Sequence, residues 1–152
     1  MSSWVHGNSG LCPLVRHGPW ALRLGLPEQI LAEGMMATIT TLPSADFQRI
    51  CRDMSNLGSE IEIKRDGKLL HLSCMGDFAN QETSIECPDD SPKITGLYSL
   101  KYLNIFTKAT SMCASVQIMQ EEGNRFLIHK YNVANLGELK FYLATKVSED
   151  QL

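Results

Sequence analysis

Four cations recur at spacings that place them on helix faces. Arg49 and Arg52 lie three residues apart, and Lys101 and Lys108 lie seven apart. Because an α-helix turns once in about 3.6 residues, each pair falls on one side of a helix, and Asn56 falls beside the arginines. Such stripes can contact phosphate oxygens without reading bases. Any solvated helix face shows the same pattern, so the spacing alone leaves both interpretations open.

Residues typical of catalysis and metal binding are scattered along the chain. No G-x-S-x-G, P-loop or H-E-x-x-H motif occurs. Asp89 and Asp90 form an acidic pair, but a metal ion needs more oxygen ligands than the sequence places near them. His71 and His129 fall within predicted strands, which favours packed or surface roles over catalysis. We therefore expect no enzymatic activity, no metal and no cofactor.

Composition allows one domain with a hydrophobic core, since 43% of the 152 residues are hydrophobic. The formal net charge is -3, whereas nucleic-acid-binding domains are usually basic. A mildly acidic domain can still contact phosphates if its cations gather on one face. No apolar run reaches the about 18 residues of a membrane span, and residues 1–22 lack the features of a signal peptide. We expect neither.

The cysteines favour free thiols. Their number is odd, and no two have the C-x-x-C spacing. This pattern argues against a disulfide framework and against a zinc site, and it is typical of a reducing compartment. The five are Cys12, Cys51, Cys74, Cys87 and Cys113.

Periodicity predicts an α+β domain in two similar halves, each a strand, a helix and further strands. Residues 1–23 show neither the 3.6-residue period of a helix nor the two-residue period of a strand. We therefore predict a flexible N-terminal arm there. Ser44 is the expected N-cap of the first helix, Gly58 its stop, and Asp66–Gly67 the centre of a hairpin turn over residues 65–68. The predicted strands are residues 36–42, 61–64, 69–75, 83–87, 93–98, 116–120, 126–133 and 138–143, and the predicted helices are residues 45–57 and 99–108.

Both predicted helices are amphipathic, so each should bury one stripe and expose the other. Asp53 lies beside the first cationic stripe and weakens its positive potential. The apolar sides consist of Phe47, Ile50, Met54 and Leu57 in the first helix and Tyr102, Leu103 and Phe106 in the second. The polar sides consist of Arg49, Arg52 and Asn56 in the first helix and Lys101, Asn104 and Lys108 in the second.

Three segments together resemble a known family. Residues 46–58 and 99–110 resemble the first and second helices of the C-terminal domain of the proliferating cell nuclear antigen family, the sliding DNA clamps of eukaryotes and their viruses. Residues 136–144 resemble that domain's last strand. The resemblance covers residues 24–150 and leaves residues 1–23 unmatched. It implies a DNA clamp domain in which two helices pack on a curved antiparallel sheet.

The resemblance implies a DNA polymerase processivity factor of DNA replication and repair in the nucleus. In the family two such domains form a subunit, three subunits close a ring around duplex DNA, and the helices line the hole. Expected partners are double-stranded DNA of any sequence, DNA polymerase and other clamp-binding peptides, the clamp loader, and further clamp subunits. The residues implied to face DNA are Arg49, Arg52, Asn56, Lys101 and Lys108.

A peptide-binding pocket on the outer face is also implied. One wall would come from the interdomain connector, and the other from the segment near the C-terminus. Leu24 and Leu26 could equally pack in a loop or in the core. The implied partner-binding residues are Leu24, Gly25 and Leu26 on the first wall, and Ala144, Lys146 and Val147 on the second.

The chain also departs from the family pattern. The first clamp domain is absent, and the stretch between Gly76 and Lys101 is shorter by around one strand, which predicts a gap or an unpaired edge in the outer sheet. Thr145 stands where the family commonly has proline. A second interpretation therefore stays open: a truncated clamp-like interaction module that does not encircle DNA. A fragment without function of its own is a third.

Overall fold

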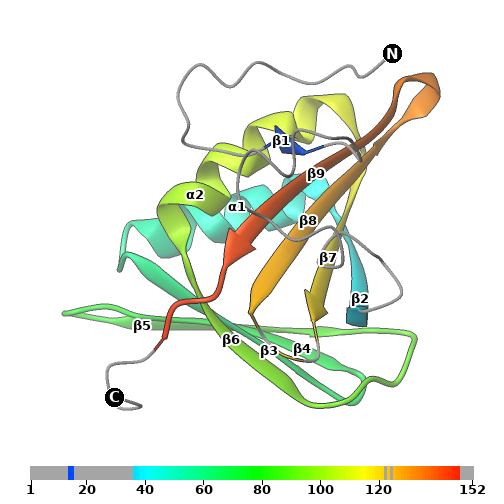
Figure 1. Ribbon diagram of the computed structural model, residues 1–152. Coiled ribbons are helices and arrows are strands. Elements are labelled where there is room, and N and C mark those ends of the chain that lie inside the picture. Colours follow the sequence, from blue (N-terminus) through cyan, green and yellow to red (C-terminus); the bar gives the residue numbers. More distant parts are fainter. Residues whose placement is uncertain (1–13, 16–35, 122, 124, 148–152) are drawn as a thin grey trace.

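The computed structural model describes residues 14–15, 36–121, 123 and 125–147. Two helices and two antiparallel sheets make up the domain (Figure 1). The five-stranded sheet has the order β1-β9-β8-β7-β2, and the four-stranded sheet has the order β5-β4-β3-β6. The elements are β1 (Leu14–Val15), β2 (Met36–Pro43), α1 (Ser44–Ser55), β3 (Glu60–Asp66), β4 (Leu69–Met75), β5 (Asn80–Glu86), β6 (Ile94–Ser99), α2 (Leu100–Phe106), the 3₁₀ helix η4 (Thr107–Met112), β7 (Ser115–Glu121), β8 (Phe126–Val133), the 3₁₀ helix η5 (Ala134–Leu136) and β9 (Gly137–Ala144).

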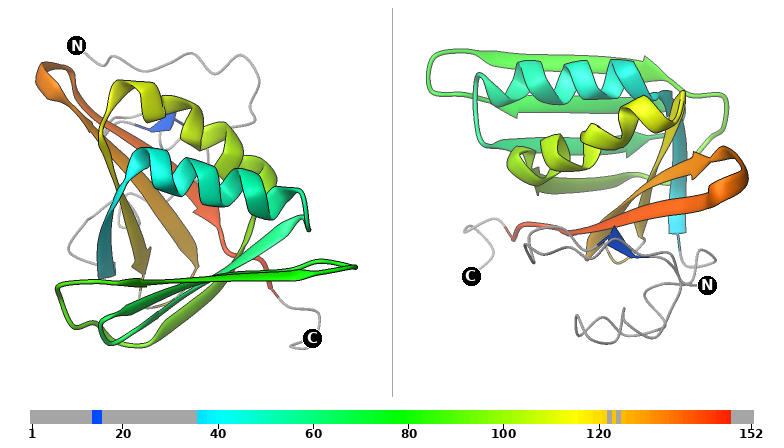
Figure 2. Two further views of the ribbon diagram at one scale, coloured as in Figure 1. Left: turned by 180° about the vertical axis from the view of Figure 1, so that it is seen from behind. Right: turned by 90° about the horizontal axis from the view of Figure 1, so that it is seen from above.

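The core lies where the helices meet both sheets. Figure 2 shows α1 and α2 together in the angle between the sheets. Phe47 of α1 and Phe106 of α2 are buried in one apolar cluster with Ile63 of the four-stranded sheet and Leu127 of the five-stranded sheet. Burial of this apolar surface is the main favourable term in folding. The helices are therefore fixed on their inner sides and present their outer sides to solvent.

The predicted α+β class and the predicted order of elements are confirmed. The strands form two sheets rather than the single curved sheet that we expected. Pairing is continuous from β5 to β6, so the predicted gap is not seen among the strands of the four-stranded sheet. The outer edge of β5 has no partner strand within the described residues.

The two helix-boundary residues act differently from the prediction. Pro43, not Ser44, is the N-cap residue of α1, and no side chain caps the helix. The Ser44 hydroxyl instead donates to the backbone oxygen of Cys113, and the Ser44 amide donates to the backbone oxygen of Ala114 at 3.0 Å. Gly58 lies beyond the C-cap, Asn56, which has ordinary helical dihedrals. The start of α1 is thus fixed to the chain leading into β7.

Close approach, rather than a left-handed backbone, explains Gly58. A Cβ atom there would lie 3.0 Å from both the Cys74 Sγ and the Met75 backbone oxygen. Left-handed backbone occurs at Gly67 instead, with φ of 58°. Since Asp66 pairs with Leu69, the hairpin turn consists of Gly67 and Lys68. The turn was predicted in the right place, but its centre is one residue later, and Arg65 belongs to β3.

The N-terminal region contains a strand that we did not predict. Leu14 pairs with Phe141 and Val15 pairs with Lys140, so β1 adds to the outer edge of β9. The remaining residues of the predicted arm lie outside the described part of the chain.

Just after the C-terminal end of β9, the Thr145 amide donates to the backbone oxygen of Arg125 at 2.9 Å. A proline at that position would lack this donor.

Candidate nucleic-acid interface

Helices α1 and α2 pack side by side and run in opposite directions. The Gln48 Nε2 atom, early in α1, donates to the backbone oxygen of Thr107 at 3.0 Å, just beyond the end of α2. The Asn104 Nδ2 atom lies 3.4 Å from the backbone oxygen of Cys51 and 3.0 Å from that of Leu100. These side-chain bonds set the position of one helix against the other.

Asn104 therefore corrects the sequence prediction. We placed it on the cationic side of the second helix, but it is half-buried and points toward α1. Sequence reasoning also missed Gln48, which makes the other bond between the helical segments. A helical wheel treats each helix alone, so polar residues at a contact between helices look solvent-facing on it.

The predicted DNA-facing residues all lie on the solvent side of the helical layer. The apolar stripe of α1 is buried, with Phe47 and Met54 at 0% exposure. The α-helix α2 ends at Phe106, and η4 continues as a 3₁₀ helix through Met112. Lys108 therefore lies on η4. The residues exposed on this layer include Arg49, Arg52, Asn56, Lys101 and Lys108.

Two exposed carboxylates on α1, Asp46 and Asp53, offset part of this positive charge. The Arg49 Nη2 atom lies 3.4 Å from the Asp46 Oδ1 atom, but both side chains are more than half exposed, and such pairs contribute little. The Lys101 ammonium lies 6.0 Å from the centroid of the Tyr102 ring. Arg52 and Lys108 form no ion pair with any residue that the structure describes. The segment 100–112 carries two lysines and no carboxylate.

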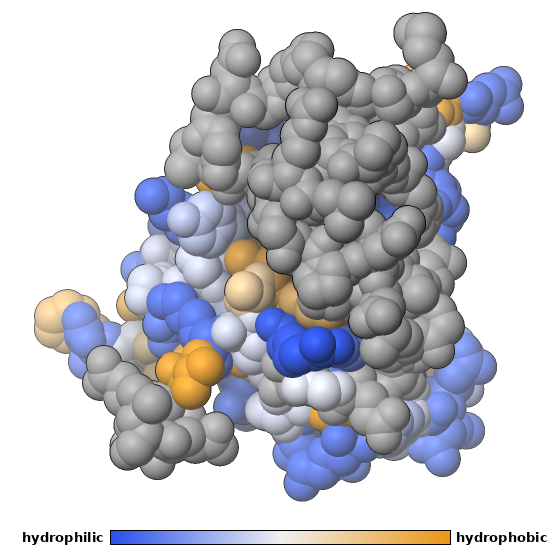
Figure 3. Space-filling model, in the orientation of Figure 1, coloured by the Kyte–Doolittle hydropathy of each residue, from blue (hydrophilic) through white to orange (hydrophobic). Residues whose placement is uncertain are grey.

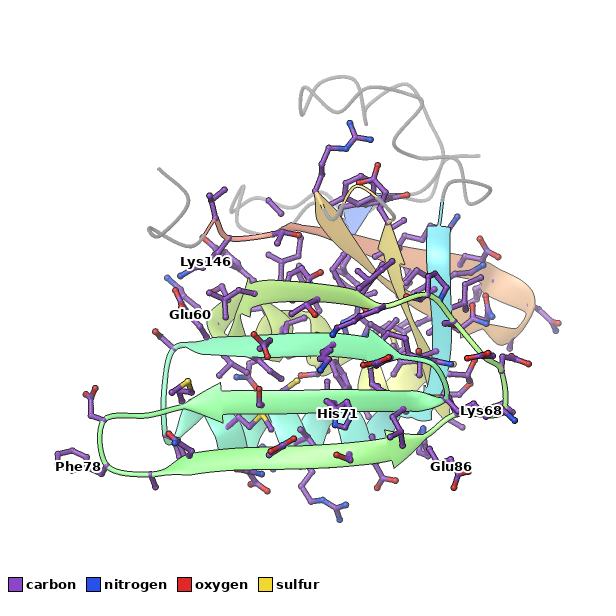
Figure 4. The ribbon with its side chains drawn as sticks, turned by 90° about the horizontal axis from the view of Figure 1, so that it is seen from below. Glu60, Lys68, His71, Phe78, Glu86 and Lys146 are labelled. Atoms are coloured by element: carbon purple, nitrogen blue, oxygen red, sulfur yellow. The ribbon has the colours of Figure 1, made fainter. Side chains whose placement is uncertain are left out.

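Acidic side chains gather on the opposite side of the domain. Strands β3 and β4 alternate between buried and more exposed residues, and β5 alternates between partly buried and exposed ones, so one face of their sheet points outward. Figure 4 shows this face from below, with His71 on β4 and Glu86 at the end of β5. In Figure 3 hydrophilic side chains predominate along the lower rim, where this sheet lies. The exposed acids of this face are Glu62, Asp66, Glu82 and Glu86.

This separation of charge answers the objection raised by the net charge of -3. Exposed acids outnumber exposed cations on the strands of the four-stranded sheet, whereas the helical segments 44–56 and 100–112 carry four exposed cations and two exposed acids. A phosphate backbone on the helical side would therefore meet a positive surface, although the chain as a whole is acidic.

The second predicted wall of the peptide pocket lies at the end of β9. Ala144 and Val147 are exposed there. The Lys146 amide donates to the backbone oxygen of Leu97 at 2.8 Å, and its ammonium pairs with Glu60, so Lys146 joins the tail to the four-stranded sheet. Both side chains are labelled in Figure 4. The first predicted wall, Leu24, Gly25 and Leu26, lies outside the described residues.

Groups that could support other chemistry are placed elsewhere. Among the described residues, no three His, Cys, Asp or Glu side chains come together as a metal site. The four described cysteines are free, and burial raises the pKa of the Cys51 thiol to about 12. His129 is fully buried, which is the packed role that its strand position favoured. No helix of the described chain is long and apolar enough to cross a membrane.

Comparison with known proteins identifies a matching family and a viral relative. The family described as "Proliferating cell nuclear antigen, C-terminal domain" matches residues 31–146. The chain is 37% identical over 123 residues to a protein of Paramecium bursaria Chlorella virus 1 named "Probable DNA polymerase sliding clamp 1". The alignment covers 73% of this chain and 46% of the viral protein, so the chain spans about half the length of this relative.

Proposed function

Because the chain belongs to the family of the proliferating cell nuclear antigen C-terminal domain, we propose that it is a sliding-clamp processivity factor for DNA polymerase. In this function it helps to encircle duplex DNA and docks replication and repair proteins. One observation carries the proposal: the exposed cations Arg49, Arg52, Lys101 and Lys108 gather on the paired helices, opposite an acidic sheet.

The chemistry of this surface suits a contact that must slide. Arginine and lysine attract phosphates without reading sequence, and each contact is weak and sensitive to salt. Four cations in one domain give little affinity for DNA by themselves. Several copies around one duplex multiply the attraction, and a closed ring is retained by topology rather than by tight binding.

The partners follow from the same proposal. Polymerases and other proteins with clamp-binding peptides would dock on the outer face near Ala144, Lys146 and Val147, with Leu24, Gly25 and Leu26 as the opposite wall. A clamp loader would open the assembly onto DNA, and further clamp subunits would complete it. The nucleus is the location that fits this work. The contacts belong to binding, and we propose no catalytic step.

The share of the relative that the chain spans supports a second candidate function. The alignment covers 46% of the viral clamp, and the family match spans residues 31–146. The chain would then be an interaction module that docks peptides or joins complete clamps without encircling DNA. Light scattering separates the two candidates. Six copies of 17.0 kDa give a ring of 102 kDa, whereas a module stays near 17.0 kDa at every concentration.

The decisive experiment asks whether the protein is held on DNA by topology. The chain is incubated with linear duplex that has a biotin at each end, and streptavidin is then added to half of the sample. Both halves are passed through a sizing column at about 0.2 M salt, which weakens direct phosphate contacts. A clamp stays on the blocked DNA and is lost from the open DNA. Equal retention on blocked and open DNA would overturn the proposal that the chain encircles DNA. It would favour the interaction module.

A further inference from the structure

The last turn of α1 carries a serine next to one of the exposed cations. Ser55 is the final residue of the helix, and its side chain is exposed. Its hydroxyl donates to the Arg52 backbone oxygen at 2.7 Å. Because residues three apart in a helix are neighbours on its surface, the side chains of Ser55 and Arg52 lie side by side. The end of α1 therefore presents an accessible hydroxyl beside a guanidinium.

The neighbouring helix brings a second cation to the same place. The two hydrogen bonds between the helical segments share one register, in which three residues forward along α1 match three residues back along α2. Continuing this register sets Ser55 level with the first residue of α2, beside Lys101. Ser55 lies about two helical turns after Gln48, whose side chain reaches across to the end of α2, so both face the same side of α1. Figure 2 shows the two helices side by side.

The spacing of Arg52 and Ser55 is one that a class of protein kinases selects. Such a kinase binds an arginine in an acidic groove and thereby places the serine three residues later at the γ-phosphate of ATP. No other serine or threonine of the chain has an arginine three residues before it. A kinase binds its substrate in an extended form, so the last turn of α1 has to open. Helix ends open more readily than helix centres, which suits a serine at the final position.

A phosphate at this position would cancel the positive surplus of the helical surface. The helical segments 44–56 and 100–112 carry four exposed cations and two exposed acids, which leaves two positive charges in excess. A phosphoserine carries about two negative charges at pH 7. Its oxygens accept strong hydrogen bonds from guanidinium and ammonium groups, and the register of the helices supplies both, from Arg52 and Lys101. One modification would therefore remove the charge on which attraction to DNA depends.

We propose that Ser55 is a phosphorylation site of an arginine-directed serine kinase, and that its phosphate binds Arg52 and Lys101 and so switches off the contact of the helices with DNA. The switch rests on the proposed function, whereas the modification itself does not.

The reaction is a transfer of the γ-phosphoryl group of ATP. The Ser55 Oγ atom attacks the γ-phosphorus, and an Oγ–P bond forms as the bond from that phosphorus to the bridging oxygen breaks. ADP leaves with this oxygen, and the hydroxyl proton passes to the catalytic aspartate of the kinase. The proton is then no longer available for the bond to the Arg52 backbone oxygen. The negative end of the helix dipole disfavours a phosphate here, so the phosphate turns toward the two cations.

The first experiment asks whether the folded chain is modified at Ser55. The whole chain is incubated with ATP and calcium/calmodulin-dependent protein kinase II, which selects this spacing, and mass spectrometry locates the phosphate. The natural chain and the matched control Ser59→Ala, which removes a nearby exposed serine, should each gain this phosphate. Ser55→Ala and Arg52→Gln should lose it. An unmodified natural chain, or equal incorporation into Ser55→Ala, would overturn the site.

The second experiment measures the contacts of the phosphate without DNA. Phosphorus NMR of the modified chain follows the second ionisation of the phosphate, whose ordinary pKa is about 6. Nearby cations favour the doubly charged form, so this pKa should be lowered in the modified chain. Lys101→Gln should bring the pKa back toward its ordinary value, whereas Lys93→Gln, which removes an exposed lysine just before β6, should not. Equal values in all three modified chains would overturn Lys101 as a partner of the phosphate.

The third experiment measures the switch by fluorescence anisotropy of a labelled duplex at about 20 mM salt, where phosphate contacts are strong. The modified chain should bind about tenfold more weakly, and the slope of log affinity against log salt should fall by about two, because two cations no longer meet DNA. Ser55→Asp should weaken binding in the same direction, and Ser84→Asp, which adds the same charge on β5, should not. Equal binding of the modified and unmodified chains, or no binding by either, would overturn the switch. If the switch works but neither form is retained on end-blocked DNA, encirclement fails and the switch stands.

Discussion

Asn104 on α2 donates its side-chain amide to the backbone oxygen of Cys51 on α1, 3.4 Å away, and to the backbone oxygen of Leu100 at 3.0 Å. One side chain thus joins the two helices that carry the exposed cations. Because Lys101 lies on α2 and Arg52 lies on α1, the bond fixes how far apart these charges are held. The spacing of the cationic surface depends on a residue that contributes no charge to it.

Asn104→Ala should lower the free energy of unfolding by about 1 kcal/mol, the net worth of a typical buried hydrogen bond, while leaving the net charge unchanged. Urea unfolding measures the change. Asn56→Ala is the matched control, since Asn56 is exposed at the end of α1 and its loss should change stability little. Equal stability of the two variants would mean that the bond between the helices does not hold them.

Reversing the charge of the four exposed cations on the helices tests whether they face DNA. Changing Arg49, Arg52, Lys101 and Lys108 to Glu should abolish retention on end-blocked DNA, because attraction to phosphates becomes repulsion. The fold should survive, since all four side chains are exposed. Circular dichroism and the blocked-end assay measure the two outcomes.

A smaller reversal supplies the control for charge. Arg52→Glu/Lys108→Glu and Lys68→Glu/Lys93→Glu change the net charge equally, but the second pair lies around the four-stranded sheet. Only the first should reduce retention and flatten its dependence on salt. If both pairs act alike, DNA responds to overall charge and the helical surface has no special role.

The faces of the helices were predictable because they depend on local periodicity. Phe47 and Met54 had to be buried once the segment was helical, and the exposed cations then had to lie opposite. The position of Asn104 was not predictable, because it depends on where another helix lies. The prediction that Ser44 is the N-cap of the first helix was wrong for a similar reason. Its hydroxyl binds a partner 69 residues away rather than one in its own helix.

The division into two sheets was also beyond the sequence pattern. Alternation indicates which residues of a strand share a face, but it does not say which strands are neighbours. Gly58 looked like a helix stop, yet its small size serves the end of β4, which only the tertiary fold brings near. β1 escaped prediction because two residues are too few to show a period.

His129 makes the stability of the domain depend on pH. It is fully buried among Phe47, Phe106 and Tyr131, and neither ring nitrogen has a hydrogen-bond partner in the part of the chain that the structure describes. Burial lowers the pKa of His129 from 6.5 to about 3. The unfolded chain therefore binds a proton that the folded chain excludes between these pH values, and stability falls as pH falls through this window, by about 1.4 kcal/mol per pH unit.

His129→Leu should remove this dependence and raise the free energy of unfolding at pH 7, since two unpaired nitrogens leave the core. Urea unfolding at pH 7, 6, 5 and 4 measures both effects. His71→Gln is the control, because His71 lies on the outer face of β4 near Glu82, and the variant should keep the slope of the natural chain. An unchanged slope in His129→Leu would place the titrating group elsewhere.

Arg65 places a charge in the interior, and its guanidinium forms no ion pair with a carboxylate among the described residues. Its guanidinium donates to the Thr40 Oγ1 atom at 2.6 Å, to the Gly67 backbone oxygen at 3.1 Å and to the Asp89 backbone oxygen. These three neutral acceptors belong to β2, to the hairpin turn and to the loop between β5 and β6. A planar group with five donors can reach all three at once, whereas a single ammonium cannot.

Arg65→Lys should therefore destabilise the domain more than Arg65→Met, although lysine is the conservative change by charge. Lysine keeps a buried charge and loses hydrogen bonds, at a cost of about 3 kcal/mol or more. Methionine loses the same bonds but leaves no charge to be solvated, and its flexible chain fills the space. Urea unfolding ranks the two variants. If Arg65→Lys is the more stable, the position requires positive charge itself, and the shape of the guanidinium is secondary.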